Sequence, residues 1–186
     1  MTPKKIFAAT GALALTATMA LAAMETPMVG GAEMYPEKNI IENAVNSADH
    51  ETLVAAVKAA GLVETLQGEG PFTVFAPTDA AFGMLKDGAV EALLQPEAKK
   101  QLTQILTCHV VGADAMAMAI KGMIDDDGGM HVVPTLGGCE LKATYSGDKI
   151  MLEDERGRVI NVTIADVKQS NGVIHVVDRV ILPPRP

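Results

Sequence analysis

Apolar residues recur at helical spacing in the first half of the chain and at alternating spacing in the second half. Leu53, Val57 and Ala60 form one apolar stripe, so they predict a helix. Ser47 would cap its start and Gly61 stands where a C-terminal glycine belongs. After residue 109 the period changes toward two, which is typical of strands. Helices followed by strands, rather than alternating with them, indicate the α+β class.

A strand and a capped helix are expected in the middle of the first half. Phe72–Phe75 is a short run of strand-forming residues, and Pro77 ends it because proline disfavours further pairing. Thr78 can cap the next helix, with Asp79 placed favourably against the helix dipole, and this helix should continue to Gly88. The remaining helices are expected over residues 89–94, 97–107 and 113–123.

The second half predicts short strands joined by tight turns. Asn171-Gly172 is the strongest turn signal, because both residue types accept the left-handed backbone of two-residue hairpins. Gly147-Asp148 and Arg156-Gly157 mark two more hairpins, and the acidic run 125–129 is expected as a loop. The predicted strand segments are 109–111, 132–136, 140–145, 149–153, 159–168 and 172–182.

The first 22 residues have the pattern of a secretory signal peptide. Lys4 and Lys5 form a basic start, Ile6–Ala23 carries no charge, and small residues precede the cleavage point expected after Ala22. The competing interpretation is an uncleaved membrane anchor, although many Ala and Thr residues make the stretch weakly hydrophobic. The short, simple signal predicts a bacterial protein. Its cleavage predicts export to the periplasm or the extracellular space. The expected segments are a signal peptide at 1–22, an extended leader at 23–38 and a folded domain at 39–184.

Composition and charge narrow the classes of partner. Of the 186 residues 48% are hydrophobic, enough for a sizeable core, but only 3% are aromatic and none is Trp. Cleavage after Ala22 removes Lys4 and Lys5 and no acidic residue, which changes the formal net charge from −8 to −10. A chain with this much negative charge repels the phosphate backbones of nucleic acids and the surfaces of anionic lipids. We therefore expect no nucleic-acid partner and no membrane insertion after cleavage.

Cys108 and Cys139 are the two cysteines of the chain. An even pair in an exported protein favours one disulfide, because the compartment is oxidising. The alternative is two buried thiols that pack as small hydrophobic side chains.

Three stretches resemble the fasciclin domain family. Thr73–Phe82 (TVFAPTDAAF) is similar to its first signature, and the stretch from Asn171 (NGVIHVVD) to Pro183 is similar to its second. Between them, Leu106–Val111 resembles the family's central His segment, with Cys108 where an aromatic residue is common. The residues that match the two signatures are Thr73, Phe75, Pro77, Thr78, Asp79, Phe82, Asn171, Gly172, His175 and Asp178.

The resemblance covers Tyr35 to Pro184 and implies both a fold and a role. The implied fold is a wedge-shaped β-sandwich or barrel-like sheet with helices packed on one side. The implied role is cell adhesion or protein interaction outside the cytoplasm. It also suggests His109, Asp166 and Val167 as binding residues, since Asp166-Val167 is similar to an Asp-Ile element of the family. Integrin recognition is not carried over, because the aromatic residue before His109 is missing.

The sequence contains no recognisable catalytic or metal-binding motif. His50, His109, His131 and His175 stand far apart, so they form no helical metal pair, and each is expected to brace the fold. The acidic run 125–127 lacks the ligand spacing and the closing Glu of an EF-hand. No Gly-x-Ser-x-Gly elbow is present either. We therefore expect no metal, no cofactor and no enzymatic activity.

Surface binding is the function that the sequence favours. The partner would be a protein or a surface glycan, and the chain would be a monomer or a weak homo-oligomer. The alternative is a carrier that holds a small hydrophobic ligand in a cavity of the wedge, for which a pocket of about 300 Å³ or more is needed. An enzymatic role has no set of converging residues to support it.

Overall fold

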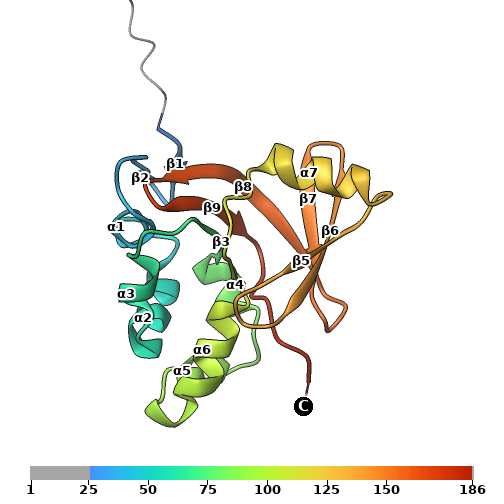
Figure 1. Ribbon diagram of the computed structural model, residues 1–186. Coiled ribbons are helices and arrows are strands. Elements are labelled where there is room, and N and C mark those ends of the chain that lie inside the picture. The colour runs from blue at the N-terminus through green and yellow to red at the C-terminus, as the bar shows by residue number, and fades with distance from the viewer. Residues whose placement is uncertain (1–25, 186) are drawn as a thin grey trace, which may run out of the picture.

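A seven-stranded mixed sheet curls into a nearly closed barrel, and most helices pack on one side of it (Figure 1). This arrangement confirms the predicted α+β class and the barrel-like sheet. The computed structural model describes residues 26–185, so the predicted signal peptide at 1–22 lies outside the described residues. The helices are α1 (Ile40–Ala44), α2 (Glu51–Ala60), α3 (Val63–Leu66), α4 (Asp79–Gly83), α5 (Ala89–Leu93), the 3-10 turn η1 (Pro96–Ala98), α6 (Lys99–Thr107) and α7 (Ala117–Asp126). The strands are β1 (Met28–Val29), β2 (Ala32–Glu33), β3 (Phe72–Pro77), β4 (Val110–Val111), β5 (His131–Pro134), β6 (Glu140–Ser146), β7 (Lys149–Glu153), β8 (Val159–Gln169) and β9 (Gly172–Val177).

The two signature stretches lie side by side at the centre of the large sheet. Its strand order is β4-β3-β9-β8-β7-β6-β5, with β3 and β9 parallel and the other neighbours antiparallel. Thr73 stands opposite Val173, and Phe75 stands opposite His175, whose ring stacks on the Phe75 ring at 5.6 Å. Residues from distant parts of the sequence therefore form one pair of strands.

Strands β3 and β9 separate two hydrophobic cores. Val74 and Ala76 point into the core under α1, α2 and α6. Phe75 belongs to the barrel core, where Ile120 and Ile124 of α7 also pack. Both faces of these central strands are buried, which is why their sequences are continuous apolar runs rather than alternating patterns.

Helix α2 receives its N-terminal cap from a distant residue. Ser47 was expected to cap it, but the helix begins at Glu51 and the Ser47 hydroxyl instead lies 2.8 Å from His50 Nδ1. The Asp79 carboxylate accepts the backbone N–H groups of Glu51 and Thr52, at 3.3 and 2.8 Å. A carboxylate satisfies the free N–H groups of a helix start and stabilises the positive end of its dipole. The expected C-terminal glycine is present, since Gly61 has φ +75°.

The largest differences between predicted and observed boundaries are at α4, α7 and the final strand. Helix α4 ends at Gly83, short of the expected Gly88. Helix α7 begins at Ala117 rather than at residue 113, because contacts described below hold residues 113–115 on the sheet, and it extends through Asp125 and Asp126 of the expected loop. The final strand ends at Val177, because the backbone of residues 180–182 bonds to side chains instead of to another strand.

Part of the predicted leader forms a small hairpin that belongs to the folded body. Strands β1 and β2 pair antiparallel, with Val29 opposite Ala32. Val29 and Met34 are 3% and 2% exposed and pack in the core under the helices. The hairpin is fastened at Gly30, whose carbonyl accepts the N–H of Ala48. The sequence predicted an extended leader here because the segment contains few large apolar residues.

A disulfide closes the barrel near its two edge strands. Cys108 precedes β4 and Cys139 lies between β5 and β6; the two are joined, with Cα atoms 5.4 Å apart. Beside the bond, the N–H of Leu136 donates to the Val110 carbonyl and that of Gly137 donates to the Thr107 carbonyl. These contacts join the two ends of the strand order, so the sheet closes without a full ladder between β4 and β5.

Candidate functional site

Residues of both signatures hold the start of α7 on the sheet. The Thr73 hydroxyl donates to the Ala113 carbonyl at 2.6 Å and accepts the N–H of Ala115 at 2.8 Å. His175 Nε2 donates to the Ala115 carbonyl at 2.8 Å, and its Nδ1 accepts the N–H of Asp166 at 3.2 Å. This pattern requires a neutral His175 ring with its proton on Nε2. The pKa of His175 is lowered by burial, which favours the same neutral form.

Asp166 completes this arrangement from a bulge in β8. Its carboxylate accepts the N–H of Ala117 at 2.7 Å, at the first residue of α7. The Asp166 backbone has φ +61°, in a stretch where the pairing of β8 with β9 is irregular. A positive φ is uncommon for a residue other than glycine, although Asp accepts it more readily than most. The bulge turns the carboxylate toward α7.

His109 holds the C-terminal segment against the helices. Its Nδ1 donates to the Ile105 carbonyl at 2.8 Å, and its Nε2 accepts the N–H of Ile181 at 2.9 Å. The side chain is 1% exposed. Burial lowers the pKa of His109 to about 4, with the charge of Arg158 adding to the effect. The ring is therefore neutral near pH 7.

Because His109 stays neutral in the fold, stability should fall as the pH is lowered. The unfolded ring takes up a proton below its ordinary pKa of 6.5, whereas the folded ring does so only near pH 4. The free energy of unfolding is then highest above pH 6.5 and decreases between these values, by about 3 kcal/mol from this group. Urea unfolding of the wild type and of His109→Asn, from about pH 7 to about pH 4.5, measures the effect. The variant should be less stable at neutral pH but have a shallower slope, and equal slopes would contradict the assignment.

The other signature residues also contact the backbone or the core. Asn171 accepts the N–H of Ile40 through Oδ1 and donates to the carbonyls of Leu66 and Gly68 through Nδ2. The Asp178 carboxylate binds the backbone and side-chain N–H groups of Asn161. In addition, the Thr78 hydroxyl accepts the N–H of Ala81, Phe82 is buried, and Pro77 ends β3.

The three predicted binding residues lie in two different places. Val167 is fully buried and His109 nearly so, while Asp166 is half-buried beside the start of α7. That a partner binds at or near these three residues stays a prediction. One residue beyond Ala117, Met118 is 84% exposed, the highest exposure among the large hydrophobic side chains described. We call Ala115, Ala117, Met118 and Asp166 the α7-start surface.

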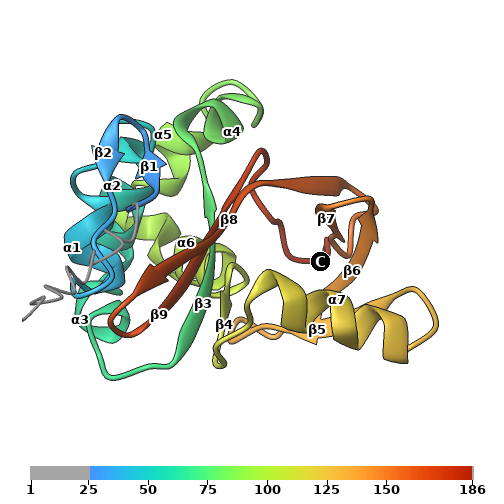
Figure 2. The same ribbon diagram turned by 90° about the horizontal axis from the view of Figure 1, so that it is seen from above.

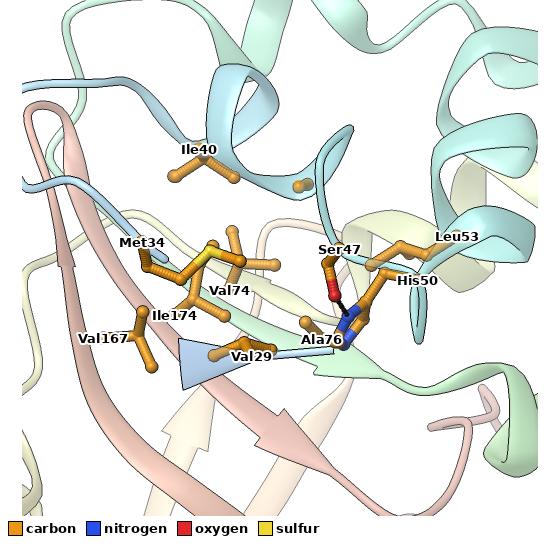
Figure 3. Close-up of a pocket in the computed structure, with 11 residues that line it drawn as sticks. Val29, Met34, Ile40, Ser47, His50, Leu53, Val74, Ala76, Val167 and Ile174 are labelled. Atoms are coloured by element: carbon orange, nitrogen blue, oxygen red, sulfur yellow. Dashed lines mark hydrogen bonds between the residues drawn. The ribbon is translucent and has the colours of Figure 1, made fainter. Parts of the chain in front are cut away.

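A cavity of about 30 Å³ lies beneath the N-terminal hairpin (Figure 3). Its walls are apolar apart from Ser47 and His50. His50 is 3% exposed, and its Nε2 is the single buried side-chain nitrogen or oxygen without a hydrogen-bond partner among the described residues. Burial lowers the pKa of this ring too, against smaller opposing effects of the Ala76 carbonyl and nearby acidic residues. No local pattern around His50 could have indicated the cavity, because most of its other walls come from the N-terminal hairpin, α1, β3, β8 and β9.

Larger hollows lie on the surface. One of about 400 Å³ runs between α5, α6 and the C-terminal segment, and one of about 520 Å³ lies along β7 and β8. Within residues 26–185 no group of three or more His, Cys, Asp or Glu side chains gathers as a metal site would require. The His131 Nδ1 atom lies 2.5 Å from the Asp127 carboxylate. None of the helices described is long and apolar enough to cross a membrane.

The fold and its contacts define a helix-covered barrel module in which the signature residues brace backbone segments. A model of the fasciclin domain matches residues 48–183. The chain therefore belongs to the fasciclin domain family, as its signatures predicted. The β1–β2 hairpin and α1 precede the matched region.

Comparisons with individual proteins agree with this assignment. The chain is 44% identical to protein sll1483 of Synechocystis over 171 residues, which covers 90% of this chain and 88% of that protein. It is 32% identical to the cell surface glycolipoprotein MPB83 of Mycobacterium bovis over 123 residues, which covers 66% of this chain and 48% of that protein. A FAS1 domain pair from the insect cell adhesion molecule fasciclin I has a similar fold, with a TM-score of 0.71 and 18% identity. That similarity covers 79% of this chain and 51% of the insect chain.

Proposed function

We propose that this protein is an exported adhesion or protein-interaction domain that acts by surface binding in the periplasm or outside the cell, without catalysis. The observation that carries the proposal is the use of its polar signature residues. Thr73, Asp79, His109, Asn171 and His175 bond to backbone groups inside the fold. Because these side chains stabilise the fold from inside, they are not available to bind a partner, and recognition would depend on other residues at the outer surface. The family's occurrence in cell-surface glycolipoproteins supports the same role.

The α7-start surface is the contact region that we propose. Met118 projects from a helix whose first turn is fixed by Asp166, so a large apolar side chain is presented on a rigid support. Exposed apolar side chains on ordered elements are the usual anchors of protein interfaces, because binding removes them from water. With a net charge of −8 over the whole chain, the partner is expected to be neutral or basic at its contact face.

Replacing Met118 with Asp should weaken binding to the cognate cell surface by about tenfold or more, because it removes one apolar anchor. Met84→Asp is the matched control, since Met84 is 65% exposed and directly follows α4, a helix that packs in the other core and lies well away from α7 (Figure 2). The measurement is retention of beads coated with each folded domain on cells of the producing organism. Equal loss for both variants, or none for Met118→Asp, would contradict the proposed contact region. No retention of wild-type beads above uncoated beads would contradict the adhesion role itself.

The carrier function is the alternative, and the observed internal volumes do not favour a preformed site. Two cavities under the helices measure about 30 Å³ each, whereas a typical small-molecule pocket has about 300 Å³ or more. Export itself is tested by fractionating the producing cells. The protein should be found in the periplasm or medium, shortened by about 22 residues at its N-terminus.

A further inference from the structure

The surface hollow between α5, α6 and the C-terminal segment has the size of a small-molecule site. It measures about 400 Å³, and small-molecule pockets typically have about 300–1,000 Å³. We call this hollow the α5–α6 groove. Its walls are mostly apolar and include Leu85, Ala92, Leu93, Ile105, Leu182 and Pro183.

The walls of the groove leave apolar side chains partly open to water. No residue of α5 is fully buried. Leu93 of this helix is half-buried, as are Leu85 and Leu182 on the neighbouring walls. Ala92 is exposed, and its small side chain leaves the groove open where a larger one would fill it. A ligand with an apolar part would remove this surface from water, which favours binding.

The charged side chains that line the groove are both basic. Lys86 and Arg156 line it and no Asp or Glu does, although the whole chain has a net charge of −8. Among the described residues neither of the two forms an ion pair. Arg156 Nε donates to the Pro183 carbonyl at 2.7 Å, which holds the guanidinium at one wall and leaves its two terminal nitrogens able to donate to a ligand. The groove therefore offers two positive charges to an anion.

The hydrogen-bonding groups of the lining distinguish a carboxylate from a peptide. Three lining residues have polar side chains, Lys86, Gln101 and Arg156, and all three supply donors. Among them only Gln101 also carries an acceptor oxygen. An extended peptide would bring a backbone N–H group at almost every residue, and most of these groups would lack a side-chain acceptor in the groove. A carboxylate brings acceptors alone, and its alkyl chain requires no hydrogen-bond partner.

We propose that the α5–α6 groove binds a free single-chain carboxylate, an anion of the fatty-acid type. Its carboxylate contacts Lys86 and Arg156, and its alkyl chain lies along Leu93 and Leu182. The guanidinium is suited to this role because its planar donors match the two oxygens of a carboxylate. The site is separate from the α7-start surface, so it adds to the proposed surface binding and does not depend on it.

The first test compares headgroups on one alkyl chain by NMR titration of the mature protein at about pH 7, where a carboxylate is ionised. Octanoate should bind about fivefold more tightly than octan-1-ol, because each exposed ion pair contributes a modest attraction. Octylammonium should bind more weakly than the alcohol, since its charge has the sign of the groove. The methyl signals of Leu93 and Leu182 should shift, whereas those of Leu141 in the barrel core should not. Octanoate that binds no more tightly than octan-1-ol, or that shifts only other residues, would overturn the proposal.

The second test lengthens the chain from hexanoate through octanoate to decanoate. Because the groove is open to solvent on one side, each further CH₂ should be about half-buried and strengthen binding about twofold, against about fourfold for full burial. Affinity that does not rise along the series would contradict an alkyl chain lying in the groove.

One pair of variants tests the headgroup contact. Lys86→Gln/Arg156→Gln should reduce octanoate affinity to that of octan-1-ol. The control Lys58→Gln/Lys168→Gln removes the same charge from exposed positions on α2 and β8 and should change octanoate affinity little. Equal losses in the two double variants would show attraction by net charge alone and would overturn the assigned contact.

A second pair tests the position of the alkyl chain. Ala92→Leu should weaken octanoate binding by about fivefold, because the longer side chain occupies space that the alkyl chain would fill. Ala59→Leu, on the exposed face of α2, should have no effect. NMR spectra without ligand verify that each variant is folded. Octanoate binding that is unchanged in Ala92→Leu and in the groove double variant would place the ligand elsewhere and overturn the site.

Discussion

Replacing Gly172 with Ala should destabilise the protein by about 3–5 kcal/mol, because the added Cβ has no space. Gly172 has φ +153° and begins β9 directly beside β3. A Cβ at this position would lie 1.9 Å from the Phe72 carbonyl oxygen and 2.8 Å from the Phe72 nitrogen. These are backbone atoms of the parallel partner strand, so the clash can be relieved only by separating the two signature strands.

Gly147→Ala is the matched control for this substitution. Gly147 also has a positive φ, +59°, but no atom lies within 4 Å of its would-be Cβ. The Gly147→Ala substitution should lower the free energy of unfolding by about 1–2 kcal/mol, from backbone strain alone. Urea unfolding of both variants measures the difference. Similar losses for the two would mean that the close approach of β3 and β9 does not limit residue 172.

Removing the disulfide should lower the free energy of unfolding by about 3–4 kcal/mol in the chain-entropy model, because the bond closes a long loop. Cys108 and Cys139 are 31 residues apart, and both are almost fully buried. The bond also joins the two ends of the strand order, so its loss should loosen β4 and β5 first. The double variant Cys108→Ala/Cys139→Ala, compared with the wild type by guanidinium unfolding, gives the magnitude.

Two further measurements separate the disulfide from simple cavity formation. Reductant should lower the unfolding midpoint of the wild type but leave that of the double variant unchanged. Hydrogen exchange should become faster at Leu136 and Gly137, whose N–H groups bond across the closure. A wild type insensitive to reductant under unfolding conditions would show that the covalent link contributes little.

The sequence was most informative where an interaction is local. Thr78 caps α4 through the N–H of Ala81, three residues away, and Gly61 ends α2 with a left-handed backbone. Both features depend on a few neighbouring residues, so their signals can be read directly. The two signatures also predicted the fold through a family resemblance, which the match over residues 48–183 confirms.

Prediction failed where a distant residue supplied the decisive contact. Asp79 lies in the first turn of α4 as predicted, but its carboxylate also caps α2, which the sequence did not indicate. The start of α7 depends on Thr73 and Asp166, from two separate strands. His50 is the buried core histidine that the sequence predicted, but only the fold shows that its ring bonds to the Ser47 hydroxyl and lines a cavity. For α2 and α7 the deciding partner is set by the register of distant strands.

The sequence by itself predicted the α+β class, the order of most helices and strands from α2 onward, most hairpin turns and an acidic, exported domain. It could do so because hydrophobic period, capping residues and turn residues act over a few positions. Only the tertiary structure decided which strands pair, which carboxylate caps α2 and how the barrel closes at Cys108 and Cys139. It also decided that His50 faces an internal cavity. Those outcomes depend on how two cores pack on the opposite faces of β3 and β9, and that packing joins residues that no local pattern connects.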